Sequence, residues 1–318
     1  MGSSPPTSRA RASVVVPGNH DGVHLGHVAL LSRARALAAR HGGARVVALT
    51  FDPHPLALLA PERAPEALTT IDRRIELLRA AGADDVAVAR FDARYAQLEP
   101  EAFVEEELVA RLGARAVMIG PDYRFGRGRA GDAALLRAAG VRHGFEVEVL
   151  DAVGSRDVAR VSSTTVREAL RRGDVARTTE LLGRPHELEG RVVAGHRRGR
   201  TIGFPTANLD GVRVMLPPDG VYAVVARVLE DAAAAPCLGG MMNVGTRPTF
   251  AAGRSIEVHL FDVAADLYDE TLRVGLVSRL RDERRFEGVE ALVAQLAKDA
   301  SAARAALADA LGAPTLLR

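Results

Sequence analysis

The feature that most constrains the fold is a glycine-rich stretch from Gly18 to His27, which reads Gly-Asn-His-Asp-Gly-Val-His-Leu-Gly-His. The apolar, β-branched run at residues 13–16 before it predicts a short buried strand. The amphipathic pattern at residues 28–40 after it predicts a helix. Backbone N–H groups at a helix N-terminus lack partners and carry partial positive charge, so they favour an anion. The stretch therefore predicts a phosphate site in a fold that alternates strands and helices.

Two histidines in this turn are candidates for chemistry at the phosphate. His24 and His27 lie three residues apart, which places them on one side of the first helical turn. Gly26 between them leaves room for a ligand to approach the backbone. A single histidine near a helix start is more often a packing or capping residue. Two of them beside free N–H groups suit a phosphate that gains charge in a transition state.

The first half of the chain continues the alternation of strands and helices. Apolar runs predict strands at residues 46–51, 85–91 and 116–120, and helical patterns lie at residues 70–81 and 100–112. Thr69 or Thr70 is the expected cap of the first of these helices. This order predicts a parallel sheet with helices on both faces, in which ligands bind beyond the carboxyl ends of the strands.

Three polar segments follow strands of this sheet. His54 lies in the turn Asp52-Pro53-His54-Pro55 and is equally well a turn residue or a nucleotide contact. The loop at residues 121–132 holds three arginines and three glycines, which is typical of a phosphate-covering loop or a solvated one. In Arg160-Val-Ser-Ser-Thr-Thr-Val-Arg167, Ser163 or Thr164 is the expected cap of the next helix, and its N-terminus suits a triphosphate.

The pattern changes beyond residue 188. Short runs with a period close to two lie at residues 191–194, 221–229, 256–261 and 272–280, and they predict a small antiparallel barrel. An alanine-rich amphipathic helix at residues 287–311 is expected to pack on it. We therefore predict a disordered tail at residues 1–12, a Rossmann-like α/β domain at residues 13–184 and a barrel domain at residues 185–318.

Oxygen donors gather in two parts of the barrel half. Thr206 and Asn208 point to one side of an extended segment after a glycine-rich stretch, and hydroxyl and amide oxygens suit Mg²⁺. As isolated residues they would more often form turns. Glu257 shares a strand face with His259. A strand glutamate is most often solvated, so the residue alone leaves its role open.

These motifs together resemble one known family. His-Leu-Gly-His at residues 24–27 resembles the signature of the nucleotidyltransferase superfamily. Its surroundings, with Phe-Asp-Pro-His-Pro, the Gly/Arg loop and Ser-Ser-Thr-x-x-Arg, resemble the bacterial FAD synthetases, which are bifunctional riboflavin kinases and FMN adenylyltransferases. Gly-Phe-Pro-Thr-Ala-Asn at residues 203–208 is similar to the riboflavin kinase signature. The resemblance covers about residues 13–305, and it departs from the family at Pro17, His20 and His196.

The resemblance implies two reactions that use ATP as co-substrate and Mg²⁺ as cofactor. In the barrel half, the riboflavin 5′-hydroxyl attacks the γ-phosphorus of ATP to form FMN. In the first half, an FMN phosphate oxygen attacks the α-phosphorus of ATP to form FAD and pyrophosphate. The family usually has Phe in place of His20, no proline at Pro17, and more often an acidic residue in place of His196.

The resemblance also implies residue roles. The catalytic residues are Glu257, His24 and His27. Nucleotide contacts of the adenylyltransferase fall on Gly18, Asn19, Asp21, Gly22, Gly26, Arg160, Ser163, Thr164 and Arg167. Flavin contacts fall on Asp122, Phe125, Arg281 and Glu283. The kinase phosphate loop uses Gly195, Arg198, Gly199, Gly203 and Pro205, and the metal ligands are Thr206 and Asn208.

Composition restricts the partners. Forty-two basic residues against forty acidic ones give a net charge of +2, which does not favour a nucleic-acid partner. No apolar run reaches the length of a membrane span, and the first twelve residues lack the apolar core of a signal peptide, so we expect a cytoplasmic protein. Cys237 is the only cysteine, which excludes an internal disulfide and a cysteine-rich zinc site. The oligomeric state stays open.

Three functions are compatible with the sequence. The first is the two-step synthesis of FMN and then FAD from riboflavin. The second is an enzyme with one active half, or one acting on a flavin analogue or another nucleotide. The third is a non-catalytic flavin-binding regulator. Retention of Glu257, Thr206 and Asn208 argues against the third, because a binder needs neither a general base nor metal ligands.

Overall fold

The computed structural model describes residues 11–150, 161–195, 198–229, 236–246, 254–263 and 266–311, with only the backbone at Arg198 and residues 309–311. By packing, the chain divides into two units. The first comprises Met1–Glu66 and Thr70–Val161, and the second comprises Ala67–Thr69 and Ser162–Arg318. Arg160, His196 and most of the predicted tail lie outside the described residues.

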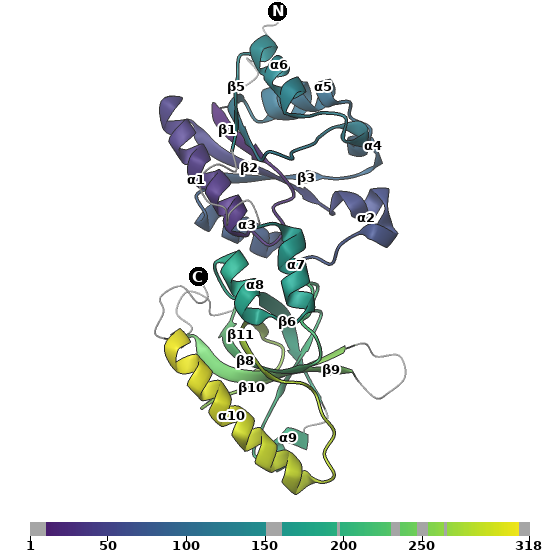
Figure 1. Cartoon of the computed structure of the whole chain (residues 1–318), viewed down its shortest axis with the longest axis vertical. Coiled ribbons are helices and arrows are strands. Elements are labelled where there is room, and N and C mark those ends of the chain that lie inside the picture. Colours follow the sequence, from purple (N-terminus) through teal and green to yellow (C-terminus); the bar gives the residue numbers. More distant parts are fainter. Residues whose placement is uncertain are drawn as a thin grey trace, which may run out of the picture. The chain divides into compact units, whose positions relative to one another are not determined.

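The first unit is built on a parallel sheet (Figure 1), as the sequence predicts, and the sheet has a fifth strand, β5, beyond the four predicted ones. Its strands are β1 (Ser13–Pro17), β2 (Arg45–Asp52), β3 (Asp85–Arg90), β4 (Ala114–Ile119) and β5 (Glu146–Val149). The spatial order is β3-β2-β1-β4-β5. The chain winds outward from β1 to β3, and then returns to place β4 on the other side of β1. The carboxyl ends of β1 and β4 therefore form the topological switch point where such sheets bind ligands.

Helices cover both faces of this sheet because its central strands are apolar on both sides. Val14 and Val16 of β1 pack toward α1 (Leu25–Arg40) and α3 (Ile71–Ala80). Val15 faces the helical layer on the other side of the sheet. That layer runs through α5 (Pro100–Ala102), the π-helical η2 (Phe103–Arg111) and α6 (Ala133–His143). Shorter elements are α2 (Pro55–Leu59), η1 (Pro61–Arg63), α4 (Ala93–Ala96) and η3 (Arg127–Arg129).

The second unit contains a closed six-stranded antiparallel barrel, which confirms the predicted architecture. Its strands are β6 (Glu187–Val193), β7 (Ala207–Asp210), β8 (Gly220–Val228), β9 (Leu238–Thr246), β10 (Arg254–Leu260) and β11 (Thr271–Arg281). They close in the order β10-β7-β6-β11-β8-β9. Neither β7 nor β9 is among the predicted strands, since β7 is short and β9 contains three glycines.

The long helix α10 (Val289–Leu311) packs on the outside of the barrel (Figure 1), as expected. Ala303 and Leu307 of α10 lie in one cluster with Ala223 and Met241, which are partners across β8 and β9. These strand residues therefore face outward. Successive side chains alternate across a strand, so their neighbours Tyr222 and Met242, both fully buried, fill the barrel interior.

Two helices, α7 (Ser163–Arg171) and α8 (Val175–Leu182), precede the barrel strands in the chain and pack within the second unit. This unit also holds the single turn α9 (Arg198–Thr201). The predicted caps Ser163 and Thr164 are wrong, because Ser162 caps α7. Its hydroxyl accepts from the Thr165 amide at 3.2 Å, and the Thr165 hydroxyl accepts from the Ser162 amide at 3.0 Å. The domain boundary near Arg184 stays a prediction for the point at which the two activities divide.

Across the ranges given above, no helix has both the length and the apolar character that crossing a membrane requires.

Two candidate active sites

The turn from Gly18 to His24 joins β1 to α1 at the switch point of the sheet. The Gly18 amide donates to the Leu49 carbonyl of β2 at 3.0 Å. His20, Gly22 and Val23 then adopt positive φ angles of 51°, 82° and 39°. Positive φ is costly for residues with a Cβ, and most of all for a β-branched valine. Contacts from the surrounding structure must therefore hold this turn in place.

His20 is one of those contacts, since its side chain is 1% exposed and lies under the turn. Its Nε2 lies 2.9 Å from the Val16 carbonyl, which can only accept, so Nε2 carries the proton and donates. A Cβ on Gly18 would lie 3.0 Å from the imidazole, so Gly18 makes room for His20. The pKa of His20 is lowered from 6.5 to about 4, mainly by burial and to a lesser extent by the Arg74 cation, and the hydrogen bond to Val16 only partly offsets this. His20 is therefore a neutral packing residue at neutral pH.

The two histidines of the motif are brought together, as the spacing predicts. The His24 and His27 rings stack with centroids 3.6 Å apart and planes 19° apart. His20 meets His27 edge-on at 4.9 Å. His24 is the N-cap residue of α1 but its side chain makes no capping bond, and the first turn of α1 holds no acidic residue. The positive end of α1 is thus available to an anion beside the ring pair.

Gly26 also makes room for groups of the protein itself. A Cβ on Gly26 would lie 3.1 Å from the His24 ring and 3.3 Å from the Val161 carbonyl oxygen. The space on the Cβ side of this Cα is therefore filled by the protein's own atoms, and a nucleotide contact of Gly26 stays a prediction. Gly26 lets the His24 ring fold back over the first turn of α1, which is how the ring reaches His27.

Asn19 and Asp21 are tied to β2 and to α3. The Asn19 carbonyl accepts from the Thr50 hydroxyl at 2.8 Å and from Arg74 at 3.1 Å, and the Asp21 carboxylate accepts from Arg74 at 3.2 Å. The Asn19 amide also lies 3.2 Å from Nε2 of His54. Because Nδ1 of His54 accepts from the Leu56 amide at 3.1 Å, His54 caps α2 and braces the turn.

The loop after β4 is more ordered than its composition indicates. Phe125 is 6% exposed, pairs with Gly131 in a β-bridge and packs 5.4 Å from the Phe103 ring. Arg124 is paired with Asp132 at 3.2 Å. Asp122 is exposed at the start of the loop. The structure thus gives Phe125 a packing role, and the flavin contacts expected of Asp122 and Phe125 stay predictions.

The helix N-terminus predicted to hold a triphosphate lies in the second unit. Ser163 and Thr164 occupy the first turn of α7, and Arg167 in the next turn is buried. With Arg160 outside the described residues, the nucleotide-binding roles of Arg160, Ser163, Thr164 and Arg167 stay predictions.

The second site lies on the outer face of the barrel. Glu257 of β10 is the direct cross-strand partner of Asn208 on β7 and of Asn243 on β9. Directly paired residues share one face, so the three polar side chains form a row across three strands. The Thr206 hydroxyl donates to the Glu257 carboxylate at 3.5 Å. The predicted alternation is confirmed, because Ile256 and Val258 are buried on the opposite face.

A pocket adjoins this row, and the glycine-rich stretch forms part of its wall. Its lining includes Gly195, Gly199, Pro205, Thr206 and Asn208. A Cβ on Gly195 would overlap the Asn208 amide, and one on Gly199 would overlap the Phe204 carbonyl. These two glycines therefore make room for protein groups on their Cβ side, and the phosphate contacts expected of Gly195 and Gly199 stay predictions. Gly203 has a φ of 82° that glycine alone adopts readily.

Two further residues with predicted flavin roles have structural partners. Arg281 of β11 binds the buried carboxylate of Asp299 on α10, with N···O distances of 2.7 and 3.0 Å. The Glu283 carboxylate lies against Gly245 of β9 so closely that a Cβ there would overlap it. Arg281 thus fastens α10 to the barrel, and flavin contacts by Arg281 and Glu283 stay predictions.

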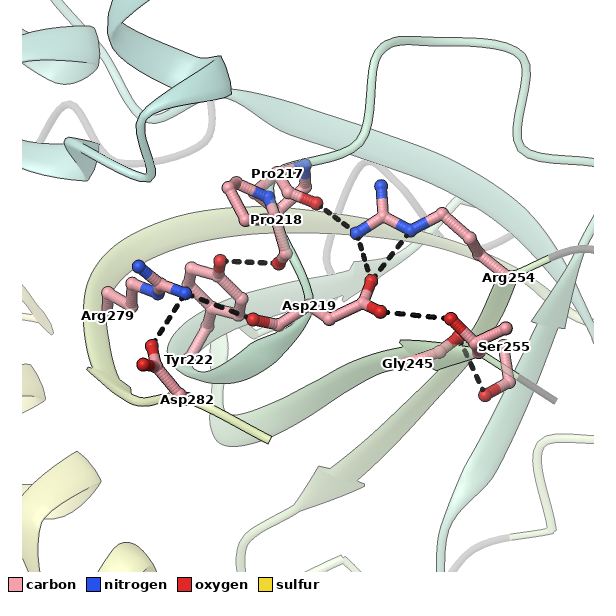
Figure 2. Close-up of polar contacts among 10 residues, drawn as sticks. Pro217, Pro218, Asp219, Tyr222, Gly245, Arg254, Ser255, Arg279 and Asp282 are labelled. Atoms are coloured by element: carbon pink, nitrogen blue, oxygen red, sulfur yellow. Dashed lines mark hydrogen bonds and ion pairs between the residues drawn. The ribbon is translucent and has the colours of Figure 1, made fainter. Parts of the chain in front are cut away.

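The hairpin that carries Glu257 is anchored by Asp219 where β9 ends at Thr246 and β10 begins at Arg254 (Figure 2). The Asp219 carboxylate accepts from Arg254 of β10 at 2.6 Å and from the Thr246 hydroxyl of β9 at 3.0 Å. Its carbonyl accepts from Arg279 of β11 at 3.1 Å. One turn thus ties three strands together, which holds the β9–β10 pair in register beside the row of polar groups.

Comparisons with known proteins identify the family. A family model described as FAD synthetase matches residues 7–165, and one described as riboflavin kinase matches residues 182–307. The chain belongs to the bifunctional riboflavin kinase/FMN adenylyltransferase family.

Relatives of this family resemble the chain over nearly its whole length. The bifunctional riboflavin kinase/FMN adenylyltransferase of Escherichia coli K12 is 42% identical over 292 residues, or 92% of this chain and 91% of that protein. The enzyme of Pseudomonas fluorescens is 41% identical and covers 93% of each. A crystal structure named as a macrolide-efflux protein from Streptococcus pneumoniae has a TM-score of 0.82 at 32% identity, covering 94% of this chain and 95% of that one.

The donor set of the bifunctional enzyme's barrel site fits a hard cation. Within the described ranges, no three His, Cys, Asp or Glu side chains are grouped as a metal site. Thr206, Asn208 and Glu257 instead offer hydroxyl, amide and carboxylate oxygens at one place. Mg²⁺ prefers oxygen ligands and takes part of its shell from substrate phosphates, so these residues fit it.

Proposed function

We propose that this chain makes FMN from riboflavin in its barrel unit and FAD from FMN in its parallel-sheet unit, with ATP as the donor in both steps. The observation that carries the proposal is the row of Asn208, Glu257 and Asn243 beside Thr206. It brings a carboxylate and neutral oxygen donors together next to a pocket, which suits phosphoryl transfer to a hydroxyl.

In the kinase step, Glu257 accepts the proton of the riboflavin 5′-hydroxyl. The hydroxyl oxygen forms a bond to the γ-phosphorus of ATP, and the bond from that phosphorus to the ADP oxygen breaks. Thr206 and Asn208 would hold Mg²⁺, which when bound neutralises phosphate charge. The hydrogen bond from Thr206 to Glu257 keeps the base next to the metal ligands. The loop of Gly195, Arg198, Gly199, Gly203 and Pro205 is proposed to enclose the phosphates.

In the adenylyl-transfer step, an FMN phosphate oxygen forms a bond to the α-phosphorus of ATP and the bond to pyrophosphate breaks. No protein nucleophile is needed, because the FMN phosphate is already ionised. His24, His27 and the N-terminus of α1 would stabilise the charge that develops on the phosphate oxygens. The remaining nucleotide contacts are proposed for Gly18, Asn19, Asp21, Gly22 and Gly26, and for Arg160, Ser163, Thr164 and Arg167.

The test is to assay each step separately on purified protein with Mg²⁺ and ATP, supplying riboflavin or FMN and separating products by chromatography. Glu257→Gln should lower FMN formation by about a thousandfold, because the general base is lost. FAD formation from supplied FMN should stay within about twofold. Glu290→Gln, an exposed change in the first turn of α10, is the matched control.

His27→Ala should give the reverse pattern, with FAD formation lowered by about a hundredfold or more. Equal loss of both products in either variant would contradict the division of labour between the two units. Production of neither FMN nor FAD by the unaltered protein would contradict the proposal as a whole.

A further inference from the structure

Arg74 is a buried arginine that reaches from α3 to the turn between β1 and α1, although α3 holds none of the predicted site residues. Its side chain is 8% exposed. One nitrogen, Nη1, donates to the Asn19 carbonyl at 3.1 Å and lies 3.4 Å from both the Thr50 hydroxyl and the Phe51 carbonyl. The other, Nη2, donates to the Asp21 carboxylate at 3.2 Å.

These contacts join the carboxyl ends of two neighbouring strands. Asn19 and Asp21 follow β1, while Thr50 and Phe51 belong to the end of β2. Arg74 therefore connects the glycine-rich turn after β1 to the carboxyl end of β2. Asp21 is 2% exposed, so its carboxylate depends on this cation in a place that water does not reach.

The turn needs such support because its backbone is strained. His20 and Val23 both have positive φ, and both flank Asp21 within two residues. His24 follows directly, and its ring stacks on His27. A change in the Asn19–Asp21 backbone is thus passed within three residues to the ring pair and to the N-terminus of α1.

We propose that Arg74 is a positioning residue for adenylyl transfer: it holds the turn from Asn19 to Asp21 so that His24, His27 and the N-terminus of α1 face the reacting phosphates together. The proposal rests on the function proposed for the ring pair. Arg74 acts through the turn, while the ring pair meets the substrate.

The shape of arginine is required as well as its charge. The guanidinium reaches a carbonyl and a carboxylate through two separate nitrogens of one rigid plane. A lysine ammonium is a single point on a flexible stem and cannot hold both acceptors in the same geometry. Lysine should therefore keep the protein folded and recover only part of the rate.

The experiment compares Arg74→Gln and Arg74→Lys with Arg73→Gln. Arg73 is an equally buried arginine one residue earlier on α3, and its Nη1 donates to Glu76 of the same helix at 2.6 Å. Arg74→Gln should lower kcat for FAD formation by about a hundredfold with KM for FMN changed less than about threefold. The kcat of Arg74→Lys should lie between that of Arg74→Gln and that of the unaltered protein. The kcat of Arg73→Gln should stay within about threefold of the unaltered protein.

Two further readouts separate positioning from loss of structure. FMN formation in the same samples should stay within about twofold. The imidazole signals of His24 and His27 in a proton–carbon NMR spectrum should shift in the Arg74 variants and not in Arg73→Gln. If Arg74→Gln does not fold, Arg74→Lys is judged by the same criteria.

Full FAD formation in a folded Arg74→Gln protein, or equal loss in Arg73→Gln, would overturn the inference. The result for His27→Ala tells the two proposals apart. If His27→Ala loses FAD formation while Arg74→Gln does not, only the positioning role is wrong. If His27→Ala keeps full activity, the role proposed for the ring pair, on which the Arg74 proposal rests, is wrong.

Discussion

The two units present their candidate catalytic groups in different ways. In the parallel-sheet unit, the groups lie on a turn and a helix end, and the turn holds two non-glycine residues at positive φ. In the barrel unit, Glu257 and its neighbours lie within paired strands, where the ladder fixes which side chains are adjacent. A turn must be held by specific side chains such as His20 and Arg74. A strand row is held by backbone hydrogen bonds that do not depend on residue type.

The two sites should therefore be sensitive to different kinds of substitution. The turn site should be sensitive to substitutions of buried supporting residues that never meet the substrate. The barrel site should be sensitive mainly to residues that crowd the row itself or loosen the helix packed beside it.

The first prediction concerns the attachment of α10 to the barrel. Asp299→Asn leaves the Arg281 cation without its carboxylate, and breaking such a pair costs about 3 kcal/mol or more. Chemical denaturation should show this loss in the transition of the barrel unit, with the transition of the parallel-sheet unit unmoved. Asp262→Asn removes an exposed partner of Arg304 on the same helix and should change neither transition measurably. Equal effects from both variants would contradict the anchoring role.

The second prediction concerns crowding at the barrel row. Gly195→Ala places a methyl group where the Asn208 amide lies, so the Asn208 side chain must leave its present position beside Glu257. FMN formation should fall by about a hundredfold, while FAD formation from FMN is retained. Gly288→Ala is the control, because nothing lies within 4 Å of its Cβ position. Unchanged FMN formation in Gly195→Ala would show that the row tolerates displacement.

The third prediction uses pH to test the support under the turn. The folded state holds His20 at a pKa of about 4 against 6.5 when unfolded, so between these values the unfolded state binds more protons. The contribution of His20 to the free energy of unfolding is therefore at its maximum above about pH 6.5 and is lost as the pH falls toward 4. Lowering the pH from 7 to 5 should cost the parallel-sheet unit about 2 kcal/mol through His20.

His20→Phe, which restores the family's usual residue, should remove that part of the pH dependence. Denaturation at the two pH values measures it directly. An identical pH dependence in both proteins would contradict the buried, neutral state of His20.

The fourth prediction sets activity against stability at the start of α1. The methyl group added by Gly26→Ala pushes the His24 ring and the Val161 carbonyl each away from residue 26 by a few tenths of an ångström. FAD formation should fall by about tenfold. Alanine in a helix is favoured over glycine, so thermal stability should not fall with it and should rise by up to about 1 kcal/mol. A parallel loss of stability and activity would show that Gly26 serves packing alone.

Much of the fold was predictable from local patterns. Apolar runs alternating with amphipathic helices predict the parallel sheet, and the period-two runs predict the barrel. The errors in the predicted elements have local causes. The edge strand β5 reads Glu-Val-Glu-Val, and its glutamates pair with Arg33 and Arg40 of α1, so no apolar run marks it. The α7 cap is shifted by one residue because three of its neighbours also carry hydroxyls.

The candidate sites were also only partly predictable from the sequence. Motif spacing alone predicts that His24 and His27 meet, and that Glu257 and His259 share a face, because both follow from the geometry of one element. The role of Arg74 was not predictable, since a buried arginine on an ordinary amphipathic helix carries no local signal. The sequence also carries no local signal that Gly18, Gly26 and Gly195 make room for the side chains of His20, His24 and Asn208.

By itself, the sequence determined the two architectures and the residue types that each site offers, because helix and strand periods and turn preferences act over a few neighbouring residues. Only the tertiary structure decided which groups from distant segments meet: Asn208 and Asn243 on either side of Glu257, Arg74 beneath the turn, and Arg281 on Asp299. The physical reason is that strand register and burial are set by the whole core at once, and a buried charge finds its partner only when that core has formed.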